Sequence, residues 1–469
     1  MHKLSLGYFL AVSTIWVGCS SSDGASGGTS TGGVTASPTG GSVGSSGGTS
    51  ASGGIIGSGG SGSGGKGLGG AAASGGSVGN SGGTVSAGGA TGADAGAGGT
   101  NGSGGASAAG GTTSKGGTSG NGGISSSGGV SSTGGGSSAS VGTSGYAAAG
   151  ASGQTKPTGS GTAVTVLPWA GFKGAVSFTF DDANQTQIDH YSELEAQNTK
   201  GNSVRYTFYV ITGKTTEMAS SVWPQAQKDG HELANHTKSH LQTGDVATLG
   251  ADADAAETFL KSKFGVTAYS LAAPYGTSTY QDVAVTRFLT NRGVGDGGIA
   301  MTDNPDNTAT PASSLKFNLP CYIPATGASA TAMEASLSAT ASAGKWKTML
   351  VHGFSGGSDG AYQPVDIKEF TATVAWAKTQ GNIWLDTVVN VSAYWIAGYK
   401  FSKLTPATSG SDKTWTWKTS DFSDHFPPGH YLRVKTDGGT LKQGNTTLAW
   451  DDHGYYEVSL DAGTLTLSP

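Results

Sequence analysis

The chain has few charged residues and almost no cysteine, and each of these shortages excludes certain classes of protein. Only 12% of its 469 residues are charged, against roughly 25% in ordinary soluble domains. Lys and Arg total 26, Asp and Glu total 31, and the formal net charge is −5. This balance gives no basic stripe for a polyanion, so we expect no nucleic-acid partner. Cys19 and Cys321 are the only cysteines, which allows one disulfide at most.

The low charge belongs mainly to the first third of the chain. From Ser20 to about Thr162 nearly every residue is Gly, Ser, Thr or Ala, without a sustained apolar period. Such a segment cannot bury enough apolar surface to offset its conformational entropy. We therefore predict a disordered linker at residues 20–162, a main domain at 163–398 and a small domain at 399–469.

The first 19 residues have the pattern of a secretory signal peptide. Lys3 is followed by the apolar stretch Leu4–Val17, which is too short for a permanent membrane span. Gly18-Cys19 then resembles a bacterial lipoprotein processing site, although Trp16 stands where Leu is usual. We expect Cys19 to be acylated and to anchor an exported protein to the cell envelope membrane. The alternative is plain cleavage and secretion.

From Lys173 onward, strand-like apolar runs alternate with helical segments. The expected strands are 175–180, 206–211, 232–234, 269–272, 315–319, 348–352 and 383–385, and the expected helices are 187–197, 222–228, 246–263, 280–291, 330–341 and 365–379. This alternation predicts parallel strands covered by helices, in an α/β barrel or a doubly wound sheet. After Tyr399, short Thr-, Val- and Trp-rich segments separated by Gly and Pro predict a small all-β domain.

Two groups of polar residues have the composition of a catalytic metal site. Asp181 and Asp182 end the apolar run 175–180, and His236 and His240 follow about fifty residues later. One Asp and two His would leave positions open for water and substrate. If the histidine segment is helical, both rings share one face. The Asp pair alone is more typical of a solvated turn or a helix cap than of a metal site.

Four motifs together resemble the polysaccharide deacetylase superfamily, the NodB-homology or carbohydrate esterase 4 group. They are T-F-D-D at 179–182, H-x-x-S-H at 236–240, Pro274-Tyr275-Gly276, and Leu350-Val351-His352. The resemblance covers about residues 164–397 and implies a distorted (β/α) barrel. A zinc peptidase is disfavoured, because Thr237 stands where H-E-x-x-H requires Glu.

The resemblance implies a role for each motif residue. Asp181 is the general base and His352 the general acid, and the Tyr275 backbone N–H stabilises the oxyanion. The implied metal ligands are Asp182, His236 and His240, with zinc expected and cobalt or nickel compatible. Pro274 and Leu350 would contact substrate, Leu350 at the acetyl methyl group, and Ser239 would brace the histidine loop.

Two family features have no clear counterpart. The arginine that normally holds the base is replaced by Ala272, and Asp296 is only the nearest candidate for the fourth, acidic motif. We expect deacetylation of an acetylated polysaccharide: N-acetylglucosamine polymer first, with O-acetyl xylan as the competitor. The alternative is a catalytically silent, surface-displayed glycan-binding protein. Trp415 and Trp417 would share one strand face, either stacking on sugars or, as we expect, forming the core of the β domain.

Overall fold

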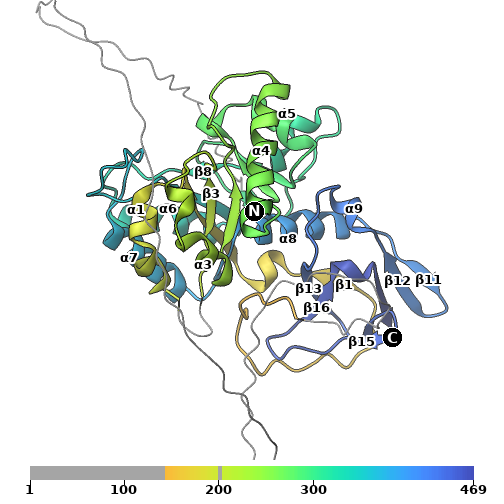
Figure 1. Cartoon of the computed structure of the whole chain (residues 1–469). Coiled ribbons are helices and arrows are strands. Elements are labelled where there is room, and N and C mark those ends of the chain that lie inside the picture. Colours follow the sequence, from red (N-terminus) through yellow and green to blue (C-terminus); the bar gives the residue numbers. More distant parts are fainter. Residues whose placement is uncertain (1–142, 199–202) are drawn as a thin grey trace, which may run out of the picture. The chain divides into compact units, whose positions relative to one another are not determined.

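The computed structural model describes residues 143–198 and 203–469 (Figure 1). These residues belong to one compact unit. The expected signal peptide, the anchor at Cys19 and linker residues 20–142 lie outside the described residues. None of the helices in the described part is long and apolar enough to cross a membrane.

The main sheet is a distorted barrel of parallel strands. Its strands run in the order β6-β5-β4-β3-β2-β9, with bounds β2 (Gly174–Asp181), β3 (Thr207–Val210), β4 (Glu232–Asn235), β5 (Ser270–Ala272), β6 (Thr290–Arg292) and β9 (Lys345–Val351). Strand β8 (Cys321–Tyr322) pairs with β9, and single bridges from Arg292 to Leu319 and from Gly295 to Cys321 connect it toward β6. β7 (Ile299–Ala300) and β10 (Ile383–Leu385) pair with β9 and β2. The predicted α/β barrel is confirmed.

Helices alternate with these strands and cover the outside of the barrel. They are α1 (Gln185–Asp189), α2 (Tyr191–Glu195), α3 (Val222–Lys228), α4 (Val246–Phe264), α5 (Thr279–Val285), α6 (Ala330–Ser342), α7 (Ile367–Thr379) and α8 (Val388–Phe401). Asp245, Ser329, Asp366 and Thr387 begin α4, α6, α7 and α8, and each side chain accepts a backbone N–H. Each such cap stabilises its helix by about 1 kcal/mol, which explains why these helices begin where they do.

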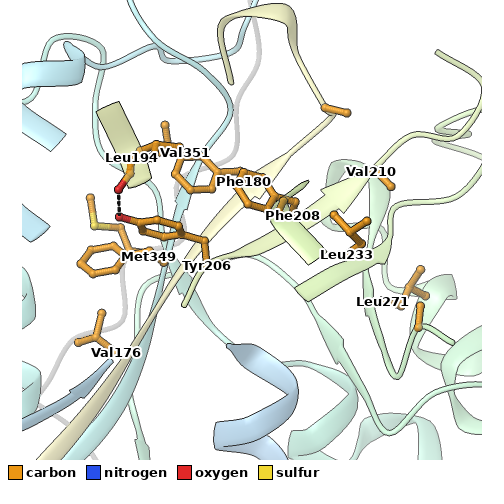
Figure 2. Packing of buried hydrophobic residues seen from close by; sticks show 14 of the residues in the cluster. Val176, Phe180, Leu194, Tyr206, Phe208, Val210, Leu233, Leu271, Met349 and Val351 are labelled. Atoms are coloured by element: carbon orange, nitrogen blue, oxygen red, sulfur yellow. Dashed lines mark hydrogen bonds between the residues drawn. The ribbon is translucent and has the colours of Figure 1, made fainter. Parts of the chain in front are cut away.

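Strand β2 is buried on both faces and sets the register of the barrel. Its outward side chains, such as Val176 and Phe180, pack under the helices, where Phe180 stacks on Phe208 at 5.0 Å between ring centroids (Figure 2). Burying one such side chain contributes roughly 1.5–3 kcal/mol, so a one-residue slip of the strand would be costly. The two-residue period then turns Asp181 to the inner face.

The C-terminal part forms two antiparallel sheets, as predicted. One contains β1 (Val164–Val166), β13 (Tyr431–Thr436) and β16 (Tyr456–Ser459); the other contains β11 (Ala407–Ser409), β12 (Asp412–Thr416), β17 (Thr464–Ser468), β14 (Thr440–Gln443) and β15 (Thr446–Thr447). The short α9 (Thr419–Phe422) follows β12. Trp415 and Trp417 are buried, with ring centroids 6.2 Å and 5.6 Å from that of Phe401. They are core residues and offer no face to a sugar.

The boundaries predicted at 162 and 398 lie inside well-packed structure. Residue 398 falls within α8, and β1, which precedes the barrel, pairs with β13. Before residue 163, the carbonyls of Tyr146 and Ala147 accept hydrogen bonds of 3.0 Å and 2.7 Å from the buried Arg433 guanidinium. Residues 143–150 therefore contact the C-terminal sheets.

Three expected elements differ from the structure. The strand expected at 315–319 is a 3₁₀ turn over Leu315–Phe317, and the helix expected at 280–291 ends at Val285 before β6. The helix expected at 187–197 is two short helices, α1 and α2, joined at His190. Short apolar runs fit a strand or a helix equally well, and long-range pairing decides between them.

Candidate metal and catalytic site

Asp182, His236 and His240 bring three potential metal-ligand atoms together at the carboxyl ends of β2 and β4. Asp182 directly follows β2, and both histidines follow β4. The Nε2 atoms of His236 and His240 lie 3.4 Å and 3.6 Å from Asp182 Oδ1, and all the ligand atoms lie within 4.8 Å of one another. Two imidazoles and one carboxylate form a donor set that zinc accepts, with room for further ligands.

The hydrogen bonds of these residues fit a divalent cation. Nδ1 of His236 lies 2.9 Å from the Ala272 carbonyl oxygen, to which it donates, so Nε2 is the ring nitrogen that faces Asp182. Asp182 Oδ1 is buried and has no hydrogen-bond partner among the described residues. Two lone pairs facing each other repel, whereas a cation between them would satisfy both.

Charge and burial keep these side chains ready to bind a cation. Burial opposes ionisation of Asp182, yet the neighbouring imidazoles, His236 above all, outweigh it and hold the Asp182 pKa well below its usual range. Burial lowers the pKa of His240 to about 4. At neutral pH the carboxylate is therefore ionised and the His240 imidazole is neutral, as metal ligation requires.

The segment between the two histidines is a loop, not a helix. Thr237 and His240 have φ of 63° and 54°, in the left-handed region, so the ring pair does not depend on helical spacing. The loop is tied to α4, because the Ser239 backbone N–H donates a 2.8 Å hydrogen bond to the Asp252 carboxylate. Ser239 thus braces the loop through its main chain.

Asp181 lies beside the metal-ligand cluster and is held by an arginine that the sequence motifs did not identify. Its Oδ2 is 3.5 Å from His236 Nε2 and forms an ion pair with Arg292 Nη2. Both side chains are buried, with 3% and 1% of their surfaces exposed. The other oxygen, Oδ1, has no hydrogen-bond partner in the described part of the chain, so it is available to accept a proton from a water molecule.

Arg292 occupies the position next to the missing family arginine. It ends β6, where it is the register partner of Ala272 on β5. Paired residues on neighbouring parallel strands point to the same face about 4.8 Å apart, so a guanidinium from either strand can reach Asp181. Arg292 is fixed further by a 3.0 Å hydrogen bond to the Gly293 carbonyl and by the Tyr209 ring, 5.4 Å from its Cζ.

His352 follows β9 on the other side of Asp181. Its carbonyl oxygen accepts 2.8 Å hydrogen bonds from the side-chain amides of Asn184 and Gln187. Burial lowers the His352 pKa, although the charges of Asp181 and Asp182 act in the opposite direction. Its Nδ1 is buried without a partner among the described residues. Leu350, two residues earlier on β9, is buried and faces the same side of the strand.

The remaining predicted positions divide between the site and the surface. Pro274 is buried in the turn after β5, and Tyr275 follows with φ of 55° and its ring 4.5 Å from that of His240. Asp296 is 58% exposed and forms a 2.8 Å ion pair with Lys347. Asp296 therefore makes a surface ion pair and is not part of the metal-ligand cluster.

Residues 171–293 match the sequence model of the polysaccharide deacetylase family. Comparison with curated proteins gives no match. Similar solved structures include the Xyl-CE4 domain of a multidomain xylanase from the hindgut metagenome of Trinervitermes trinervoides, at 15% identity and a TM-score of 0.31 over 46% of this chain and 88% of that one. Peptidoglycan deacetylase PdaC from Bacillus subtilis and a family 4 acetyl xylan esterase from Clostridium thermocellum are each 14% identical, with a TM-score of 0.30 over 46% of this chain and 89% of theirs.

Proposed function

We propose that the chain removes acetyl groups from a polysaccharide with the aid of a divalent metal ion, a proposal that starts from the match of residues 171–293 to the sequence model of the polysaccharide deacetylase family. One observation carries the proposal: Asp181, held by Arg292, lies within 3.5 Å of the imidazole of His236, which also faces Asp182. A base and a metal-ligand cluster therefore share one small volume at the strand ends. That arrangement suits metal-assisted hydrolysis.

Each residue of the site has a separate role in the proposed reaction. A divalent ion held by Asp182, His236 and His240 would polarise the acetyl carbonyl and lower the pKa of water. Asp181 accepts the proton of the attacking water through its unpartnered Oδ1, while Arg292 fixes the carboxylate. The Tyr275 backbone N–H donates to the developing oxyanion, a contact worth roughly 3 kcal/mol in comparable sites.

His352 completes the cleavage by protonating the departing group, which an amine leaving group requires. The hydrogen bonds from Asn184 and Gln187 to the His352 carbonyl hold this residue at the strand end. Leu350, on the same face of β9, would contact the acetyl methyl group. Zinc is the metal we propose, and cobalt or nickel would suit the same ligands.

The substrate we propose is the N-acetyl amide of an N-acetylglucosamine polymer, and O-acetyl xylan is the competitor. The test is acetate release by the purified chain, stripped of metal and then reloaded with zinc, on chitooligosaccharides, peptidoglycan, poly-N-acetylglucosamine and acetylated xylan. Zinc-dependent release from one of these would support the proposal and identify the substrate. No release from any of them would count against it.

The rival function is glycan binding without turnover, suggested by the missing arginine at Ala272. Arg292 weakens that argument, because it supplies the guanidinium contact to Asp181 from the neighbouring strand. Asp181→Asn separates the two functions: we predict that turnover falls about 10²- to 10⁴-fold while zinc remains bound. Activity equal to wild type would remove Asp181 from the role of base.

For the location of the protein, we propose export and acylation at Cys19, followed by the Gly- and Ser-rich linker. Labelled fatty acid should enter the wild-type chain but not Cys19→Ala. The only other cysteine, Cys321, is buried, so label at that position is not expected. Equal labelling of both proteins would exclude the anchor.

A further inference from the structure

Large apolar side chains are exposed at only one region of the described structure. Four such side chains are exposed in residues 143–198 and 203–469: Val246, Tyr275, Val294 and Tyr362, at 40%, 60%, 47% and 60%. Each lies in a segment after a barrel strand, namely β4, β5, β6 and β9. All four therefore lie on the carboxyl-end face, which also carries the metal-ligand cluster. Exposed apolar side chains gathered on one face mark a binding surface.

The two tyrosines contact the catalytic imidazoles directly. The ring centroids of Tyr275 and His240 lie 4.5 Å apart. Those of Tyr362 and His352 lie 5.3 Å apart, in an edge-to-face arrangement. Between β5 and β9 the barrel order places β4, β3 and β2 on one side and β6 and β8 on the other. Tyr275 and Tyr362 thus flank the site from nearly opposite sides.

Both tyrosines stand on braced backbone. Tyr362 belongs to the loop after β9, where Phe354 bridges to Val365 and the Asp359 carboxylate accepts a 2.7 Å hydrogen bond from the Thr186 N–H at α1. On the opposite side, Val294 packs over the turn that carries Tyr275, because a Cβ added at Gly276 would come within 2.5 Å of Val294 Cγ2. The exposed rings are therefore positioned before any ligand binds.

We propose that Tyr362 and Tyr275 are stacking faces for two sugar units on either side of the reacting acetyl group, so the site binds an internal part of a glycan chain. A pyranose ring has an apolar C–H face and polar edges, which match the apolar face and polar tip of a tyrosine. The occupant must be the substrate, because each ring contacts an imidazole of the reaction site. The inference rests on the proposed function and adds to it which side chains bind the sugar units on either side of the reacting one.

Tyr362 carries the sharper test, because it lies outside residues 171–293 and belongs to none of the sequence motifs. The variants are Tyr362→Ala and Tyr362→Phe, with Tyr399→Ala on α8 as the control for loss of a tyrosine outside this face. On hexa-N-acetylchitohexaose we expect Tyr362→Ala to raise KM about 3- to 10-fold with kcat nearly unchanged. Tyr362→Phe and Tyr399→Ala should match wild type, and the effect should be smaller on the disaccharide.

A binding measurement separates this inference from the proposed activity. Affinity for chitohexaose and xylohexaose is measured by calorimetry with the metal-stripped chain, which requires no turnover. Weaker binding by Tyr362→Ala than by wild type supports the stacking face even if no acetate is released from any glycan. Equal binding of the two proteins to both glycans, or an unchanged KM in an active Tyr362→Ala, overturns it and leaves the deacetylase proposal intact.

Discussion

Replacing Arg292 tests whether this residue performs the task of the absent family arginine. Arg292→Ala leaves Asp181 as a buried carboxylate without its ion-pair partner, since only 3% of the Asp181 side chain is exposed. Breaking a buried pair by removing one partner costs about 3–5 kcal/mol of stability. We expect a loss in catalysis as well, because a base displaced by about 1 Å can lose roughly 10² in rate, which corresponds to about 2.7 kcal/mol.

A second arginine provides a matched control. Arg287 forms a bidentate pair with Asp254, at 2.8 Å and 3.1 Å, on the surface near α5. Exposed pairs of this kind contribute about 0–1 kcal/mol. Arg287→Ala should therefore lower the urea midpoint slightly and leave acetate release unchanged, while Arg292→Ala lowers both.

The neighbouring strand offers a rescue. Because Ala272 and Arg292 are register partners, Ala272→Arg in the Arg292→Ala background moves the guanidinium back to β5. The double variant should regain part of the lost kcat, a result that a purely structural role would not produce. If Arg292→Ala does not fold, Arg292→Lys decides: it keeps the charge but loses the planar fork, so stability should be largely retained and kcat should fall.

The assay is acetate release by the zinc-loaded chain on the polymer that gives the highest wild-type rate, together with urea unfolding of each variant. A folded Arg292→Ala with kcat within twofold of wild type would refute the positioning role. Failure of the double variant to exceed Arg292→Ala would refute the equivalence of the two strand positions.

Two further predictions concern metal and pH. Zinc at a hundred times its Kd should stabilise the folded chain by about 2.7 kcal/mol, seen as a higher melting temperature that chelation reverses. His236→Ala should lose this shift and His425→Ala, outside the barrel, should keep it; a shift in both would place the metal elsewhere. Burial lowers the pKa of His430. The His430 imidazole therefore stays neutral in the folded chain at a pH where the unfolded chain already binds a proton. The stability that is present above about pH 6.5 is lost as the pH falls below that value. Between about pH 7.5 and 5.5, the free energy of unfolding in urea should fall more in wild type than in His430→Gln; an equal fall in both would contradict this.

The central strands and the metal-ligand cluster could be predicted because their signals are local. Strand β2 is a continuous apolar run that ends in two carboxylates, and the start and end of α3 were predicted correctly. Once strands are known to be parallel, residues at their carboxyl ends must meet at one edge. This rule alone places Asp182 near His236 without any knowledge of the side-chain contacts.

Arg292 could not be found in this way, because its role depends on lateral pairing. Strand β6 has only three residues, Thr290–Arg292, which is too short to show a two-residue period, and the expected helix 280–291 concealed it. Between β6 and β8 the barrel is closed through isolated bridges, such as the one between Arg292 and Leu319. Only the pairing of Arg292 with Ala272 shows that the guanidinium comes from β6, where the family has it on the strand that corresponds to β5.

The direction of the Asp182 side chain is the other feature that pattern reasoning missed, and it explains how two adjacent carboxylates serve one site. In a continuous strand Asp181 and Asp182 would point to opposite faces, yet both approach His236 Nε2, at 3.5 Å and 3.4 Å. The φ of 76° at Asp182 turns its Cβ away from the strand alternation. Eight non-glycine residues in the described ranges have positive φ, and six lie in segments at the site: Asp182, Ala183, Thr237, His240, Tyr275 and Gln363. Each such residue costs roughly 1–2 kcal/mol; at Asp182 and His240 glycine would relieve the strain but cannot supply a carboxylate or an imidazole. Burial in the barrel therefore has to offset a strain that the chemistry requires.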